Sequence, residues 1–142
     1  AGTPGVFDTD LTFKDIARRE FKRLRKAVRR LDSIPTDAEL HRVRIKTKRA
    51  RYAAELAESE IGKSATKFIR CAKVLQDILG KHQDAVVGEQ RVRALFAETE
   101  GQRAAFTAGR MVERQRQRRD QARTRFWSLW KKVNKQGRKA WS

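Results

Sequence analysis

The sequence predicts an all-α protein, folded as an antiparallel four-helix bundle. Apolar residues recur at intervals of three and four over long stretches, and no stretch alternates apolar and polar residues as a half-buried strand does. Only two prolines, Pro4 and Pro35, interrupt the chain. We expect residues 11–134 to form one helical domain, between a flexible N-terminal segment at 1–10 and a loose C-terminal tail at 135–142.

The first two helices are expected at about 12–31 and 36–59. One apolar face of the first consists of Phe13, Ile16, Ala17, Phe21, Leu24, Ala27, Val28 and Leu31. Thr36 and Glu39 have the Thr-x-x-Glu spacing of a capping box, so the second helix should begin there. Its core stripe is Leu40, Val43, Thr47, Ala50, Ala54 and Ala57. Most of these residues are small, which allows a neighbouring helix to approach closely.

The third and fourth helices are expected at about 64–97 and 103–134. Gly80 interrupts the third and is a candidate bend. Core residues in the third should be Phe68, Cys71, Val74, Leu75, Ile78, Leu79, Val86, Leu95 and Phe96. Those in the fourth should be Phe106, Val112, Ala122, Phe126, Leu129, Trp130 and Val133. Four amphipathic helices with short connections favour an antiparallel bundle.

The charge of the chain is strongly positive and unevenly distributed. There are 35 Lys and Arg residues against 17 Asp and Glu, a formal net charge of +18. Residues 41–52 contain six basic groups and no acid, and the first helix carries nine basic groups. Such a charge costs stability through self-repulsion, and an acidic partner would relieve it. Nucleic acid, polyphosphate, an anionic membrane surface and an acidic protein are all candidates.

The second helix orders its cations on one face. At about 100° per residue, one face of this helix holds His41, Arg44, Lys48, Arg51, Tyr52 and Glu55. That face lies beside the apolar stripe, so its cations should line a groove between helices and concentrate positive potential there. Arg offers forked donors to phosphate oxygens, and Lys offers a mobile point charge. The alternative is that these are solvated side chains of a basic protein.

Two stretches resemble the CHAD family, the conserved histidine α-helical domain. The first is Leu-His-Arg-Val-Arg-Ile-Lys-Thr-Lys-Arg-Ala-Arg-Tyr at 40–52, and the second is Leu-Gln-Asp-Ile-Leu-Gly-Lys-His-Gln-Asp-Ala-Val-Val at 75–87. The resemblance covers roughly 11–130 and implies the basic, groove-forming second half of a domain built from two similar four-helix halves. We therefore expect the chain to be a fragment, completed either by the missing half or by a homodimer. The alternative is a monomer in which the first and fourth helices close on each other.

The resemblance also implies a function and a set of site residues. It implies binding of inorganic polyphosphate, in the cytoplasm and at polyphosphate granules. Carried over by position, the anion site includes His41, Arg44, Lys48, Arg49 and Arg51. By their spacing alone, Arg18, Lys22, Arg25 and Arg29 form a second row one helix earlier. Lys73 and Lys81 flank the Leu-Gln-x-x-Leu-Gly part of the second motif, at 75–80, and are additional candidates for the site.

Catalysis and metal binding have little support in the sequence. His41 and His82 have no cysteine or carboxylate cluster at ligand spacing, so we expect no metal and no cofactor. No phosphate-binding loop, catalytic triad or carboxylate pair is present, so we expect a binding protein and not an enzyme. We expect Asp77 and Asp84 to pair with basic residues, with Asp84 directing cations into the groove.

Other binding functions remain open. Nucleic acid would use the same phosphate-directed cations, although no helix-turn-helix, RRM or zinc-finger pattern is present. An acidic protein partner is the third class. Trp130 should be a core residue, whereas Trp127 and Trp141 could stack on bases. The single cysteine, Cys71, should be a buried hydrophobe in a reducing compartment, and no apolar run is long enough to span a membrane.

Overall fold

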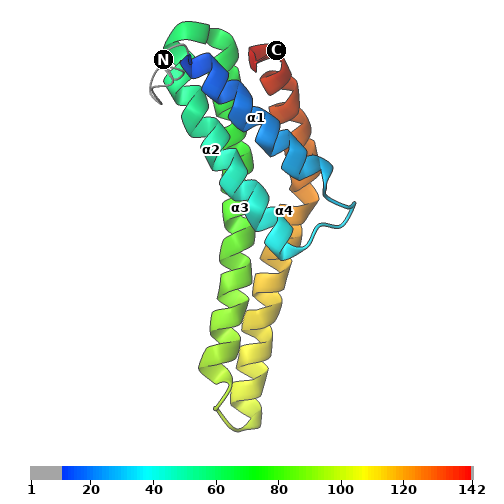
Figure 1. Ribbon diagram of the computed structural model, residues 1–142. Helices are drawn as coiled ribbons and strands as arrows, with labels where there is room; N and C mark the ends of the chain where they lie inside the picture. Colours follow the sequence, from blue (N-terminus) through cyan, green and yellow to red (C-terminus); the bar gives the residue numbers. More distant parts are fainter. Residues whose placement is uncertain (1–10, 142) are drawn as a thin grey trace, which may run out of the picture.

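The computed structural model describes residues 11–141, and it confirms the all-α fold class (Figure 1). Its four helices are α1 (Phe13–Arg29), α2 (Asp37–Ile61), α3 (Lys63–Phe96) and α4 (Gln102–Trp141). They run alternately up and down, and α3 and α4 form a long hairpin whose far half extends beyond α1 and α2 (Figure 1). The flexible segment expected at 1–10 lies outside the described residues.

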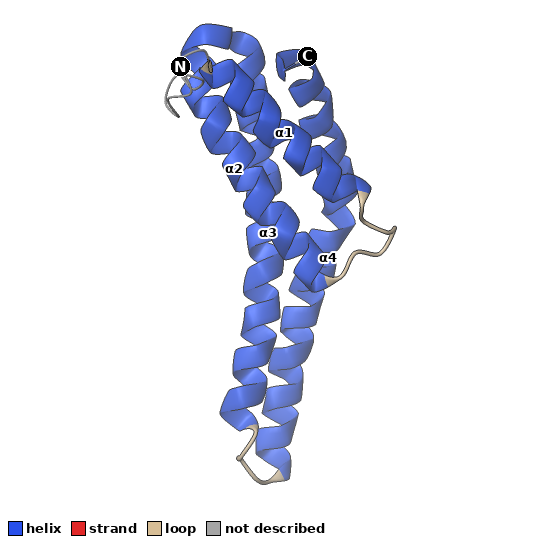
Figure 2. Cartoon of the chain, in the orientation of Figure 1, coloured by secondary structure: helices blue, strands red, loops and turns tan. Residues whose placement is uncertain are grey.

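The helix boundaries follow from local chemistry. Thr12 and Thr36 each form a complete capping box, with Asp15 and Glu39 respectively, so the expected start of α2 is confirmed. Gly62 alone separates α2 from α3, and its φ of 81° lies in the left-handed region that glycine adopts without strain. The α1–α2 and α3–α4 connections are the two loops drawn in tan in Figure 2.

The core fills the part of the bundle where all four helices meet. Its largest fully buried hydrophobic side chains include Leu24, Leu40, Phe68, Leu75 and Phe126. The small-residue stripe expected on α2 is buried throughout its length, and the Thr47 hydroxyl donates 2.8 Å to the carbonyl of Val43. Because these side chains are short, α2 can pack closely between α1 and α3.

The expected loose tail at 135–142 is wrong for the residues that the structure describes there, 135–141. α4 continues to Trp141, which is only 2% exposed. The Trp141 ring packs edge-on against Phe68 with 5.7 Å between ring centroids, and the Trp141 carbonyl accepts a 2.8 Å hydrogen bond from Arg18 Nε. Gly137 lies within the continuous helix α4, and its lack of a side chain leaves space for the ring of Phe21.

The far half of the α3–α4 hairpin also departs from expectation. Leu95 and Phe106 were expected in the core, but they are 72% and 68% exposed. The reason is that α1 and α2 end before this part of the hairpin, so only one face of each helix finds a partner (Figure 1). Gly80 does not interrupt α3, which is one continuous helix.

Candidate anion-binding site

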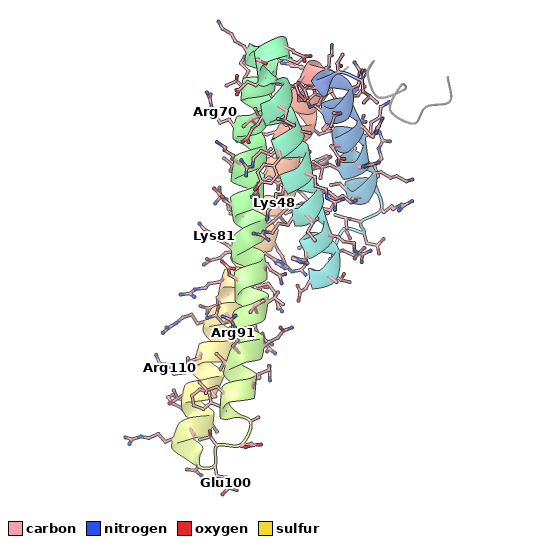
Figure 3. All side chains as sticks on the ribbon, turned by 60° about the vertical axis from the view of Figure 1, so that its left-hand side comes forward. Lys48, Arg70, Lys81, Arg91, Glu100 and Arg110 are labelled. Atoms are coloured by element: carbon pink, nitrogen blue, oxygen red, sulfur yellow. The ribbon has the colours of Figure 1, made fainter. Side chains whose placement is uncertain are left out.

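The predicted cation row of α2 lies along its contact with α3. His41, Arg44 and Lys48 are half-buried, and Arg49 is exposed. A β-carbon at Gly80 would lie 3.6 Å from Nε and 3.9 Å from Nη2 of Arg44, so the Arg44 guanidinium lies against α3 at this glycine. Figure 3 labels Lys48 on α2, next to α3. Arg44 therefore joins the two sequence motifs, because it belongs to the first and Gly80 to the second.

Two atoms of this row lack protein partners. Nε of Arg44 and Nδ1 of His41 are buried, and neither has a hydrogen-bond partner among residues 11–141. Most buried polar atoms in proteins are hydrogen-bonded, and an unpaired one is costly. Because both atoms are shielded from solvent, a ligand would meet Arg44 and His41 through their remaining, solvent-exposed atoms.

Arg51, at the end of the row, is already engaged within the protein. Its Nε donates to Oε1 of Gln76 on α3 at 2.7 Å, and its Nη1 donates to Oε1 of Glu55 at 2.7 Å. The guanidinium also lies 4.6 Å from the centroid of the Tyr52 ring. The structure thus places Arg51 beside the predicted site, where it links α2 to α3.

The predicted second row on α1 faces α4 instead of the Arg44 row. Arg18, Lys22 and Arg25 line a groove with the C-terminal end of α4, including Gly137 and Trp141. Burial, followed by the nearby charges of Arg29 and Arg138, lowers the pKa of Arg25. The two rows are not brought together, because the faces that α1 and α2 present to other helices depend on packing that spacing alone does not reveal.

Lys73 and Lys81, on either side of the stretch 75–80 of the second motif, are both exposed on α3. Lys81 lines a cavity of about 530 Å³ between α3 and α4, together with Asp84, Arg118 and Arg125. This side of α3 points away from α2 (Figure 3). Asp84 forms no salt bridge within the described chain, so the structure does not show it directing cations toward Arg44.

A polar network around His82, near the cation row of α2, was not predicted from the sequence. Nε2 of His82 lies 3.0 Å from Oδ1 of Asp37, the first residue of α2, and Arg123 of α4 donates to the same oxygen and to the carbonyl of Pro35. Nη1 of Arg119 lies 3.9 Å from the other Asp37 oxygen. The network fixes the start of α2 to α3 and α4. Only the histidine of the second motif hinted at it.

Burial sets the protonation state of this network. His82 is 1% exposed, and burial lowers its pKa despite the opposing effect of Asp37. Burial alone would raise the pKa of Asp37, but hydrogen bonds from Arg123 and His82 keep it below its ordinary value. A neutral His82 thus donates from Nε2 to an ionised Asp37, and its buried Nδ1 has no hydrogen-bond partner among residues 11–141.

The described residues contain neither a metal cluster nor a membrane span. Across 11–141, no group of three or more His, Cys, Asp or Glu side chains is placed to hold a metal ion. Within the same range, no helix combines the length and apolar character needed to cross a bilayer.

These features define a basic α-helical bundle whose second helix carries cations against its third. The chain belongs to the CHAD family: the model of the CHAD domain matches residues 9–93, which include both motifs. Two Mycobacterium tuberculosis proteins, the uncharacterized proteins Rv2226 and MT2285, are each 32% identical to it over 106 residues, or 73% of this chain. The chain spans only 19% of the length of each relative. No solved structure matches it.

Proposed function

We propose that this chain is an inorganic polyphosphate-binding module and not an enzyme. The observation that carries the proposal is the contact of Arg44 with Gly80. It holds the half-buried Arg44 side chain, whose Nε has no hydrogen-bond partner among residues 11–141, on the helix face that also carries His41 and Lys48. Polyphosphate binding is a general property of CHAD domains, and the net charge of +18 suits a polyanion. A binding module of this kind would act in the cytoplasm, at polyphosphate granules.

The chemistry of the row suits phosphate oxygens. The Arg44 guanidinium offers planar, forked donors, Lys48 contributes a point charge, and His41 contributes a ring nitrogen. An extended anion can contact several of these groups at once, whereas orthophosphate can contact few. Long-chain polyphosphate should therefore bind more tightly than orthophosphate, and its affinity should fall steeply with salt as bound counterions are released.

Nucleic acid is the alternative ligand, and the three tryptophans do not favour it. Trp141 is buried, and Trp130 is buried as expected, so neither is free to stack on a base. Trp127 is 36% exposed and packs against Phe126 with 4.9 Å between ring centroids. A single half-covered tryptophan is a small platform compared with the aromatic surfaces of proteins that bind single strands.

Competition calorimetry tests the proposal. Long-chain polyphosphate, RNA and heparin would be titrated at matched anionic charge and at two salt concentrations. We expect polyphosphate to bind most tightly and orthophosphate most weakly, with a strong salt dependence for polyphosphate. A flat salt response, equal affinity for orthophosphate, or tighter binding of RNA would contradict the proposed function.

A further inference from the structure

A second concentration of positive charge lies in a groove between α1 and α2, on the other side of α2 from Gly80. The groove has a volume of about 300 Å³. Five cations line it. Arg23 pairs with Glu20, and the other four are Lys26 of α1, Arg30 at the C-terminal cap of α1, and Arg42 and Lys46 of α2. Ala27, Leu31 and Val43 complete its walls. None of these four cations belongs to the row that faces α3.

The four cations converge because of helix periodicity and packing. Lys26 of α1 and Arg30, the C-cap of α1, are four residues apart, and Arg42 and Lys46 are four residues apart on α2, so the members of each pair lie on the same face. α1 and α2 pack side by side, with Leu24, Val28, Leu40 and Val43 buried. This packing brings the two pairs to opposite edges of one groove.

Acidic groups do little to balance these charges. Within residues 11–141, none of the four cations forms a salt bridge. Arg23, also at the groove, pairs with Glu20 at 2.8 Å. Glu39 is the one acid that lines the groove, and its carboxylate accepts the backbone N–H of Thr36 at 2.9 Å, which lowers its pKa. Four cations held near one another repel, and a bound anion would relieve that repulsion.

We propose that the α1–α2 groove is a second binding site for condensed phosphate, independent of the row that contains Arg44. This inference rests on the proposed function. Arg30 and Arg42 offer forked donors from opposite edges, and Lys26 and Lys46 add charge at each edge. The groove is small, so it takes a short run of phosphates. One chain thereby binds polyphosphate on both sides of α2.

Tripolyphosphate is a suitable probe, because it is too short to reach both sites at once. Calorimetry on the full chain should give two molecules bound per chain. The double variant Lys26→Gln/Arg42→Gln should bind one, and so should Arg44→Gln/Lys48→Gln. The control Arg103→Gln/Arg114→Gln removes the same charge from two exposed residues at the far half of the hairpin and should retain both sites. Far-ultraviolet circular dichroism should show unchanged helix content in all three variants.

Each outcome has a distinct meaning. If Lys26→Gln/Arg42→Gln retains the stoichiometry and affinity of the unaltered chain, the groove is not a site, while the proposed function survives. If all three variants weaken binding equally, the ligand responds to overall charge and the second site is refuted. If the unaltered chain binds long-chain polyphosphate but not tripolyphosphate, the second site is also refuted. Binding of neither ligand would refute the proposed function itself.

Discussion

Arg44 of α2 lies across Gly80 of α3, with 3.6 Å between its Nε and the position that a β-carbon at Gly80 would occupy. At that separation a single methyl group makes an ordinary van der Waals contact, whereas a larger side chain would meet the guanidinium. The glycine of the second motif therefore leaves room for the arginine of the first. A small residue at position 80 of the continuous helix α3 is therefore compatible with this position of the guanidinium.

The first prediction concerns this contact. Gly80→Leu should displace Arg44 and weaken polyphosphate binding by about tenfold, the effect of losing one charged hydrogen bond. Gly80→Ala should bind as the unaltered chain does, because its methyl group fits. Calorimetry measures both affinities, and thermal unfolding checks that the variants remain folded. Equal affinity for Gly80→Leu and Gly80→Ala would show that the position of Arg44 does not matter.

The second prediction separates the cation row from overall charge. Arg44→Ala, Lys48→Ala and Arg49→Ala together should reduce polyphosphate affinity by at least about 100-fold, because several charged contacts are lost. The matched control replaces three exposed arginines of the hairpin, Arg103, Arg110 and Arg114, with alanine. Helix content should not change in either variant. If both triple variants lost the same affinity, binding would reflect bulk charge alone.

The third prediction assigns a structural effect to Arg51. Its bond to Gln76 holds α2 against α3, and its bond to Glu55 orients the guanidinium within α2, so Arg51→Ala should lower the free energy of unfolding by about 1 kcal/mol. Its effect on polyphosphate affinity should be smaller than that of Arg44→Ala. Urea unfolding and calorimetry measure the two quantities. If Arg51→Ala lost more affinity than Arg44→Ala and kept the stability of the unaltered chain, Arg51 would be a ligand of polyphosphate and not a structural residue.

The fourth prediction concerns the close approach of α4 to α1. A β-carbon at Gly137 would lie 2.2 Å from Cε1 of Phe21, so Gly137→Ala should destabilise the fold by about 1–3 kcal/mol. Gly109→Ala is the control, since a β-carbon there would have no neighbour within 4 Å, and it should stabilise the helix by about 0.5–1 kcal/mol. Chemical unfolding decides the matter. A neutral Gly137→Ala would mean that Phe21 can move aside at little cost.

The fifth prediction follows from His82. Burial lowers its pKa in the folded state, so between that lowered value and the ordinary value of 6.5 the unfolded chain binds more protons. Stability should therefore fall as the pH drops below about 6.5, and recover above it. His82→Gln retains a donor for Asp37 and does not titrate, so its stability should change less over this range. Urea unfolding at pH 7.5 and 5.5 measures how much the free energy of unfolding changes between the two pH values. An equal change in His82→Gln and in the unaltered chain would show that His82 is not responsible.

Much of this arrangement could be predicted from local sequence. Apolar spacing determined that the chain is helical, and the Thr-x-x-Glu pattern determined where α2 begins, because both depend only on residues within a few turns of one another. The side of α2 that carries Arg44 and Lys48 also follows from the same spacing. Their role as ligands of polyphosphate stays a prediction.

Only the tertiary structure decided which faces meet. Arg18 and Lys22 face α4, Leu95 and Phe106 lie beyond the reach of α1 and α2, and Trp141 closes the core. The groove of Lys26, Arg30, Arg42 and Lys46 draws on two helices, and the bond between His82 and Asp37 joins residues 45 positions apart. Periodicity assigns a residue to a face of its own helix. Which neighbour covers that face depends on packing among distant segments, where side-chain volumes and close approaches such as that of Gly137 to Phe21 select one arrangement.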